Sequence, residues 1–166
     1  RTAVVAVKLK LTPEKGTEAE IAHAHTIHQQ AQVVPWKLST FEDCFTKPYY
    51  GVFAYENEQV IGYAIVLEVA DEATLMDIAV DDAFRGQGVG RALVDYVLTA
   101  SEQNGMIEMW LEVRESNLAA IKLYESSGFE HIETRKNYYT TKSYEANSSR
   151  TGKENAKIMK WSKAVY

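Results

Sequence analysis

The sequence predicts an α/β fold in which a mixed, mostly antiparallel, twisted sheet is flanked by helices, as one domain over residues 1–166. The first observation behind this prediction is the order of periodic segments, which runs β-α-α-β-β-β-α-β-α-β-β. The second is that no internal repeat and no linker interrupts that order. The third is a length of 166 residues, 46% hydrophobic and 25% charged, which suits a globular domain with its own core.

The first third of the chain predicts a strand followed by two helices. Residues 3–11 are typical of a strand, and residues 12–14 (Thr-Pro-Glu) predict a helix start with threonine as N-cap and proline at the first helical position. This helix is expected to run to about Gln32, because the Pro-Trp pair at 35–36 ends it. Residues 39–42 (Ser-Thr-Phe-Glu) predict a capping box that opens a second, short helix.

The middle of the chain predicts a hairpin and a third strand. Residues 50–55 and 59–69 are expected to pair around a turn at 56–58, and residues 73–80 continue as the next strand. A glycine-rich loop follows at 85–90 and leads directly into a helix.

The second half predicts two helices and three strands, in the order helix 88–104, strand 106–113, helix 117–127, strand 129–135 and strand 156–161. Gly105 and Gly128 are the expected C-caps of the two helices, and Asn117 is the expected N-cap of the second. Between the last two strands, residues 136–155 are rich in Ser, Thr, Asn and Lys. They predict a long polar loop that is mobile or forms part of a substrate lid.

The glycine loop carries most of the functional information. A short apolar strand enters a turn with three glycines and a helix follows, so backbone amides and the helix dipole can bind a phosphate group. A P-loop is excluded because no Lys-Ser/Thr follows Gly90, and a dinucleotide loop is disfavoured because the glycines are spaced G-x-G-x-G. The remaining pattern, R-x-x-G-x-G at 85–90, resembles the pyrophosphate loop of the GCN5-related N-acetyltransferases. An ordinary glycine turn that caps a helix is the alternative.

A longer stretch resembles one family within this superfamily, the bacterial ribosomal-protein-alanine N-acetyltransferases. The resemblance covers roughly residues 33–140, and residues 1–32 and the longer segment after Tyr139 depart from it. The motifs that carry it are Pro35-Trp36, Asp71-Glu72-Ala73-Thr74-Leu75, Trp110-Leu111-Glu112-Val113-Arg114, Ser116-Asn117, Ala119-Ala120-Ile121, Leu123-Tyr124-Glu125-Ser126, Gly128-Phe129 and Arg135-Lys136-Asn137-Tyr138-Tyr139.

This resemblance implies the acetyltransferase (GNAT) fold and an acyltransferase activity. The acetyl group would pass from acetyl-coenzyme A to the N-terminal alanine of a small-subunit ribosomal protein, by direct attack in a ternary complex. Cys44 lies outside every matched motif, so no acetyl-enzyme is expected.

The resemblance also assigns site residues. Glu112 would be the general base and Tyr124 the general acid, whereas a solvated glutamate and a packing tyrosine are the alternatives. The implied cofactor-binding residues are Ile78, Ala79, Val80, Gly86, Gln87, Gly88, Val89, Gly90, Arg91 and Asn117, with a bulge near 78–80 that splays the sheet and the Val80 N–H as oxyanion donor. Pro35, Trp36, Tyr138 and Tyr139 would bind the substrate, with core packing and loop anchoring as the alternatives.

Bulk properties disfavour other classes of protein. A net charge of −5 argues against a direct nucleic-acid partner, and no apolar run reaches the roughly 20 residues of a membrane helix. The single cysteine fits a reducing cytoplasm. His23, His25 and His28 could suggest a metal site, but no full ligand pattern accompanies them, so a solvated helix face and no metal are expected.

The choice of amine stays open at this stage. An α-amino group has a pKa near 8 and lysine about 10.4, so near pH 7.5 roughly a quarter of α-amines are neutral against about 0.1% of lysines. A carboxylate base therefore suits an N-terminal amine. A lysine or small-molecule amine as substrate, and a non-enzymatic acetyl-coenzyme A-binding module, are the alternatives.

Overall fold

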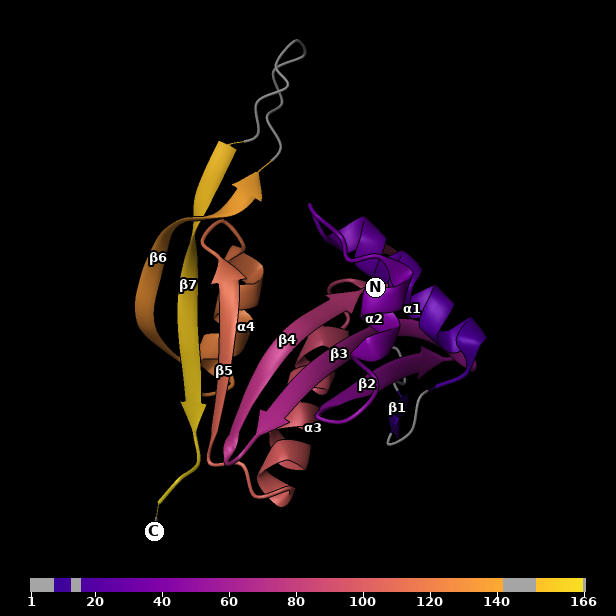
Figure 1. The fold of residues 1–166 in the computed structure, drawn as a ribbon, viewed down its shortest axis with the longest axis horizontal. Helices are drawn as coiled ribbons and strands as arrows, with labels where there is room; N and C mark the ends of the chain where they lie inside the picture. Colours follow the sequence, from indigo (N-terminus) through magenta and orange to yellow (C-terminus); the bar gives the residue numbers. More distant parts are fainter. Residues whose placement is uncertain (1–7, 13–15, 142–151, 166) are drawn as a thin grey trace.

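The computed structural model describes residues 8–12, 16–141 and 152–165 and confirms the predicted order of elements (Figure 1). The elements are β1 (Lys8–Thr12), α1 (Glu18–Ala31), α2 (Leu38–Asp43), β2 (Tyr49–Glu56), β3 (Gln59–Val69), β4 (Glu72–Val80), the 3₁₀ turn η1 (Asp82–Phe84), α3 (Val89–Gln103), β5 (Glu108–Arg114), α4 (Leu118–Ser126), β6 (Glu130–Thr141) and β7 (Gly152–Ser162). None of the helices in these ranges combines the length and apolar content that a membrane span requires.

The strands of the described residues form one seven-stranded sheet in the order β1-β2-β3-β4-β5-β7-β6. Among these described strands, the β4–β5 pair alone is parallel, and the other neighbouring pairs are antiparallel. The predicted mixed, mostly antiparallel sheet is therefore confirmed.

The sheet opens between its two central strands. β4 and β5 pair only from Glu72–Glu108 to Leu75–Leu111, and the two strands then diverge (Figure 1). At that point β4 carries a bulge, because Asp77 pairs with Ile65 whereas Leu75 pairs with Val66, which leaves Met76 as the extra residue. A bulge bends and twists its strand, so it turns the end of β4 away from β5. The predicted bulge thus exists, two residues before Ile78.

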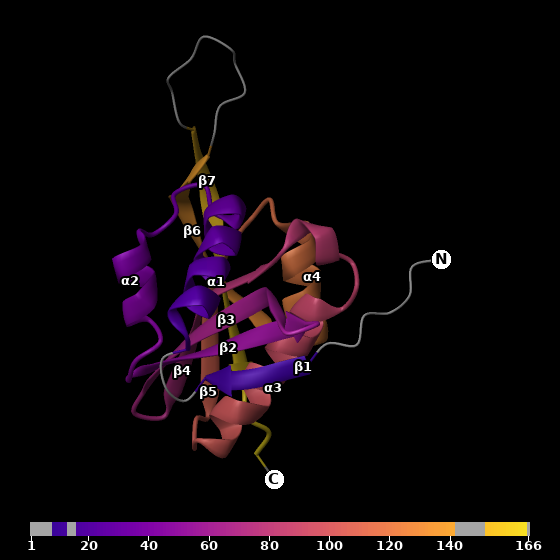
Figure 2. The same ribbon diagram turned by 90° about the vertical axis from the view of Figure 1, so that its right-hand side faces the viewer.

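Helices cover both faces of the sheet. α1 and α2 lie on one face and α3 and α4 on the other (Figures 1 and 2). The α1–α2 side packs a cluster that includes Ile21, Phe41 and Phe53, and the α3–α4 side packs a larger cluster around Leu93 and Met109. β3 contributes to both clusters, which explains the nearly unbroken apolar run in its sequence.

Both predicted helix starts in the first third are wrong. Thr12 ends β1, where it pairs with Gly51, and α1 begins at Glu18 after a capping box in which Thr17 and Glu20 bond each other's backbone N–H. The second helix begins at Leu38 with Lys37 as N-cap, so the Ser-Thr-Phe-Glu motif lies inside α2 instead of capping it. Pairing of Thr12 with the sheet and the better box at 17–20 account for the first difference.

The predicted loop at 136–155 is also partly wrong. Residues 136–141 belong to β6 and residues 152–155 to β7, and the two strands pair as far as Thr141–Gly152. Pairing across the sheet overrides the polar composition on which the loop prediction depended. Residues 142–151, and residues 3–7 of the predicted first strand, lie outside the described part of the chain.

Candidate active site

The glycine loop joins the end of β4 to α3 and leaves backbone amides exposed. Gly86 and Gly88 have φ of +76° and +84°, a region that costs other residues strain, and a Cβ at either position would meet open space. The first N–H of α3 that bonds a carbonyl one turn back is that of Ala92, which reaches Gly88 O at 3.0 Å. The amides of residues 89–91 therefore precede the first helical bond and can receive an anion.

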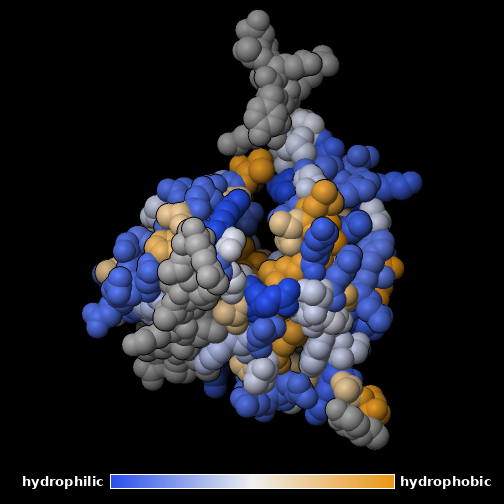
Figure 3. All heavy atoms as spheres, turned by 180° about the vertical axis from the view of Figure 1, so that it is seen from behind, coloured by the Kyte–Doolittle hydropathy of each residue, from blue (hydrophilic) through white to orange (hydrophobic). Residues whose placement is uncertain are grey.

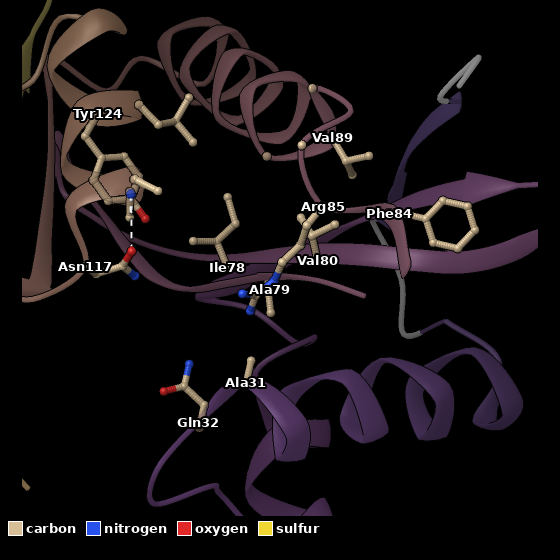
Figure 4. A pocket seen from close by; sticks show the side chains of 16 residues that line it. Ala31, Gln32, Ile78, Ala79, Val80, Phe84, Arg85, Val89, Asn117 and Tyr124 are labelled. Carbon is tan, nitrogen blue, oxygen red and sulfur yellow. Dashed lines mark hydrogen bonds between the residues drawn. The ribbon is translucent and has the colours of Figure 1, made fainter. Parts of the chain in front are cut away.

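A cavity of about 360 Å³, which we call the loop cavity, lies beside this loop. Its walls are the end of β4, the start of α3 and one side of α4, with Ala31 and Gln32 from α1 opposite (Figure 4). Seen from behind, the molecule has a central hollow in which apolar residues are exposed (Figure 3). Most of the predicted cofactor-binding residues line the loop cavity: Ile78, Ala79, Val80, Gly86, Gly88, Val89, Gly90 and Asn117.

Two predicted cofactor-binding residues, Gln87 and Arg91, are not among the residues that line the loop cavity. Arg91 extends to α4, where its Nη2 donates to Ser126 Oγ at 2.5 Å. Within the described residues, Gln87 Oε1 is buried without a hydrogen-bond partner. Their main-chain N–H groups remain in the loop and can still contribute to anion binding.

The backbone of β4 presents hydrogen-bonding groups to this cavity. Asp81 N donates to Ile61 O at 2.8 Å, and in an antiparallel pair hydrogen-bonded positions alternate with non-bonded ones. Ile78 and Val80 are thus non-bonded positions whose N–H and C=O point away from β3. They point to the side on which β5 has already diverged, and no described strand pairs with β4 there, so an extended ligand can bind these groups.

A second cavity, of about 140 Å³, adjoins the loop cavity and shares Gln32, Ile78, Asn117 and Tyr124 with it. We call it the central cavity. Glu112 on β5 and Tyr124 on α4 both line it. The fold therefore brings the predicted base and the predicted acid to one small space, next to the loop that is suited to phosphate binding.

Glu112 lies on the open side of β5. Leu111 and Val113 are buried at 2% and 6% exposure, whereas the Glu112 side chain is 35% exposed, as the alternation along a strand requires. Its Oε1 lies 3.3 Å from Arg135 Nη1. Hydrogen bonding to Glu112 is also the main cause that raises the pKa of the Tyr138 phenol. Two side chains of β6 thus hold the carboxylate in place.

Tyr124 is buried, with 6% of its surface exposed, and its ring packs against Phe129 at a centroid distance of 5.7 Å. Burial is the main cause that raises the pKa of its phenol above the ordinary value, and the negative charge of Asp77 adds to it. The phenol is therefore protonated at neutral pH and has a proton to donate.

A third cavity, of about 580 Å³, lies on the other side of Glu112. We call it the aromatic cavity, because Trp36, Trp110, Tyr138 and Tyr139 line it. Three of the four predicted substrate-binding residues are therefore together. Pro35 is exposed and is not among the residues that line this cavity.

An irregularity in β6 places the two tyrosines. The register of β6 on β7 shifts between Arg135 and Tyr139, Asn137 has φ of +54°, and Asn137 N donates to Asn155 Oδ1 at 3.0 Å. The tyrosine rings then pack edge to face at 5.0 Å, and burial raises the pKa of Tyr139 to about 12. Sequence reasoning missed Asn155, because nothing local links it to Asn137.

The prediction of a solvated helix face for the histidines is wrong for two of them. His25 and His28 are 8% and 1% exposed, and His28 Nδ1 lies 2.7 Å from Asp77 Oδ2. Asp77, Gln32 and His28 were not among the predicted site residues, although Asp77 and Gln32 line the central cavity. Their partners come from distant parts of the chain, so no local spacing could reveal them.

The chain is similar to proteins of known activity. Residues 19–129 match the Acetyltransferase (GNAT) family. The [Ribosomal protein bS18]-alanine N-acetyltransferase of Escherichia coli K12 is 42% identical over 122 residues, which cover 74% of this chain and 82% of that protein. The enzyme of the same name from Haemophilus influenzae is 40% identical over 135 residues, covering 81% and 87%. The crystal structure of the ribosomal-protein-S18-alanine N-acetyltransferase from Escherichia coli superimposes with a TM-score of 0.81 at 35% identity, covering 96% of both chains.

Proposed function

This chain belongs to the acetyltransferase (GNAT) family, and from that premise we propose that it transfers acetyl from acetyl-coenzyme A to the N-terminal alanine of a small-subunit ribosomal protein. The observation that supports this most is the central cavity, which Glu112 and Tyr124 line together between the loop cavity and the aromatic cavity. Relatives at 40–42% identity are named for this activity. A ribosomal-protein substrate implies that the enzyme works in the cytoplasm.

The loop cavity fits the acetyl donor. The open cradle at Gly86 and Gly88 and the amides at the start of α3 suit a pyrophosphate. The outward N–H and C=O groups of Ile78 and Val80 suit the peptide-like arm of coenzyme A, as a strand suits an extended partner. The donor supplies an activated thioester carbonyl, and the N–H of Val80 is our candidate to stabilise the charge that develops on its oxygen.

The amine would arrive from the aromatic cavity. A primary amine must be neutral to attack a carbonyl, and Glu112 is the carboxylate at the boundary between the aromatic and central cavities. Contacts with Arg135 and Tyr138 fix the orientation of this carboxylate. We assign to Glu112 the acceptance of the amine's proton, directly or through one water.

The departing sulfur needs a proton, and Tyr124 is positioned to hold one. In water a thiol has a pKa of about 8.5, below that of a tyrosine, so a transfer from Tyr124 would be uphill. Burial raises the pKa of Tyr124, and it would disfavour a thiolate in the same space for the same reason. The transfer is therefore compatible with a dry cavity, in which both groups prefer to be neutral.

The test is acetylation of two synthetic peptides with acetyl-coenzyme A and detection by mass spectrometry. The first peptide begins with a free Ala-Arg, and the second is an N-blocked copy that contains an internal lysine. We expect acetyl on the first peptide at its α-amine and none on the second. Acetylation of the lysine alone, or of neither peptide, would contradict the proposed substrate.

A further inference from the structure

A buried polar network joins α1 to β4 beneath the candidate active site. Asp77 accepts three hydrogen bonds, from His28 Nδ1 at 2.7 Å, from the Tyr63 hydroxyl at 2.6 Å and from Gln32 Nε2 at 2.9 Å. His28, Asp77 and Tyr63 are 1%, 7% and 0% exposed. Buried polar groups are costly unless they are satisfied, so a network at this place requires a structural or functional reason.

The partners of His28 determine its tautomer. Its Nε2 lies 2.9 Å from the backbone N of Trp36, and a backbone N–H can only donate. Nε2 is therefore the acceptor, and Nδ1 carries the proton and donates a hydrogen bond to Asp77. A neutral imidazole thus connects the Asp77 carboxylate to the main chain of Trp36.

The carbonyl of the same residue is held as well. His25, one turn earlier on α1, has its Nε2 2.7 Å from Trp36 O, so it donates there. Both main-chain polar groups of Trp36 are therefore bound by histidines of α1, and the Trp36 and His28 rings pack at 5.1 Å. We call this arrangement the histidine clamp. It fixes the segment between the end of α1 at Ala31 and the start of α2 at Leu38.

We propose that the histidine clamp, with His28 oriented by Asp77, positions Trp36 in the aromatic cavity for binding of the amine substrate. Here His28 and His25 are positioning residues, since neither is among the residues that line the aromatic cavity, whereas Trp36 is. The inference rests on the proposed function for the identity of the substrate. The histidine clamp itself is independent of the proposed function and can be measured without turnover.

The first experiment measures hydrogen exchange of the Trp36 amide in the free enzyme and in two variants. His28→Leu removes the acceptor of the Trp36 N–H. Ile27→Ala is the matched control, because Ile27 is also buried, with 2% of its surface exposed, on the same helix and belongs to the core cluster. We expect the Trp36 amide to lose most of its protection in His28→Leu and to keep it in Ile27→Ala. Protection that survives in His28→Leu would overturn the clamp.

The second experiment separates KM from kcat for the alanine peptide. His28→Leu loses the bond from Trp36 N and the bond to Asp77. Loss of the hydrogen bond that holds Trp36 should raise the peptide KM of this variant about tenfold, with kcat and the KM for acetyl-coenzyme A close to wild type. Ile27→Ala should keep the wild-type peptide KM, and His28→Gln, which can still accept from Trp36, should recover most of the loss. An equal rise in the control, or a parallel rise in the KM for acetyl-coenzyme A, would show a general loss of structure and contradict the positioning role.

A fourth variant covers the case in which His28→Leu does not fold. His25→Leu removes the hydrogen bond to the Trp36 carbonyl, keeps an apolar side chain against His28 and Phe41, and leaves the hydrogen bond between His28 and Asp77 in place. It should raise the peptide KM in the same direction, and an unchanged KM would count against the clamp. If wild-type enzyme leaves the peptide unmodified, the proposed substrate is wrong, and the exchange experiment still decides on the clamp.

Discussion

The environment of the Tyr124 phenol determines the pH range in which the proposed chemistry can operate. Burial raises its pKa, so the phenol stays protonated well above neutral pH and is lost as an acid only at strongly alkaline pH. An α-amine loses its proton near pH 8. We therefore expect kcat/KM for the alanine peptide to rise from about pH 6.5 and to level off above about pH 8.5, with no fall before about pH 9.5.

Initial rates with the alanine peptide at subsaturating concentration, measured across this range, give the profile. A rate that keeps rising toward about pH 10 would match an amine with the pKa of a lysine instead of that of an α-amine. A fall that begins near pH 8 would mean that an acid with a much lower pKa than Tyr124 is required.

Single residues also show what local sequence can and cannot reveal. Alternation along a strand puts the Leu111 and Val113 side chains on the face opposite to Glu112, and the burial pattern of β5 agrees with it. The same reasoning failed for His28, because its partner Asp77 is 49 residues away. Alternation along a strand predicts the face on which each side chain lies. Burial of a polar side chain depends instead on a hydrogen-bond partner that can be distant in the sequence.

At the scale of elements, the loop before α3 requires glycine at position 88, and this requirement can be tested. Gly88 is the N-cap of α3 at φ +84°, and a methyl group there would meet no neighbouring atom. Gly88→Ala should therefore cost about 1–2 kcal/mol through backbone strain alone. Because the strained residue belongs to the proposed pyrophosphate cradle, we expect weaker binding of acetyl-coenzyme A as well, measured by calorimetry.

Gly105→Ala is the matched control for this change. Gly105 follows the other end of α3 with φ of +90° and equally open space around it. It should lose a similar free energy of unfolding in urea and keep its affinity for acetyl-coenzyme A. Equal affinities of the two variants would contradict the assignment of the loop.

Three helix boundaries in the second half followed local cap signals, whereas the predicted caps at Thr12 and at 39–42 were wrong and the strand lengths depended on distant pairing. Gly88, Asn117 and Gly128 mark the helix ends that the sequence predicts. The extension of β6 to Thr141 and the inclusion of Thr12 in β1 depend on strands that are distant in sequence. Cap chemistry acts within a few residues, whereas strand length is set by the partner strand.

At the scale of the whole molecule, the loop cavity lies between two parts of the sheet. Ile78 to Val80 and α3 line it from the side of β4, and Asn117 and Tyr124 line it from the side of β5 (Figure 4). Acetyl-coenzyme A bound there would contact both sides and favour the native state. At a hundredfold excess over Kd this linkage is worth about 2.7 kcal/mol.

For a chain of this size we expect that stabilisation to raise Tm by about 5–10 °C. Thermal unfolding followed by circular dichroism, with and without acetyl-coenzyme A, measures it. Gly88→Ala should show a smaller rise at the same concentration. An unchanged Tm of the wild type at saturating donor would contradict binding in the loop cavity.

The topology could be predicted only in part. Alternating segments and the glycine loop indicate the fold class and the place of the proposed phosphate site. The insertion of β7 between β5 and β6, and the divergence of β4 from β5 that creates the cavities, arise from pairing choices over the whole chain. The positions of Glu112 and Tyr124 along their elements were predictable from the family resemblance, and their meeting in one cavity required the three-dimensional structure.

The most direct test of the central claim is the rate of acetyl transfer to the free alanine peptide by Glu112→Gln, with the affinity for acetyl-coenzyme A measured on the same sample. The amide keeps the shape of the side chain and cannot accept the amine's proton. We expect kcat/KM to fall by about 10²-fold or more while acetyl-coenzyme A binds as in the wild type. A wild-type rate in this variant would contradict Glu112 as the base and, with it, the site on which the proposed function depends.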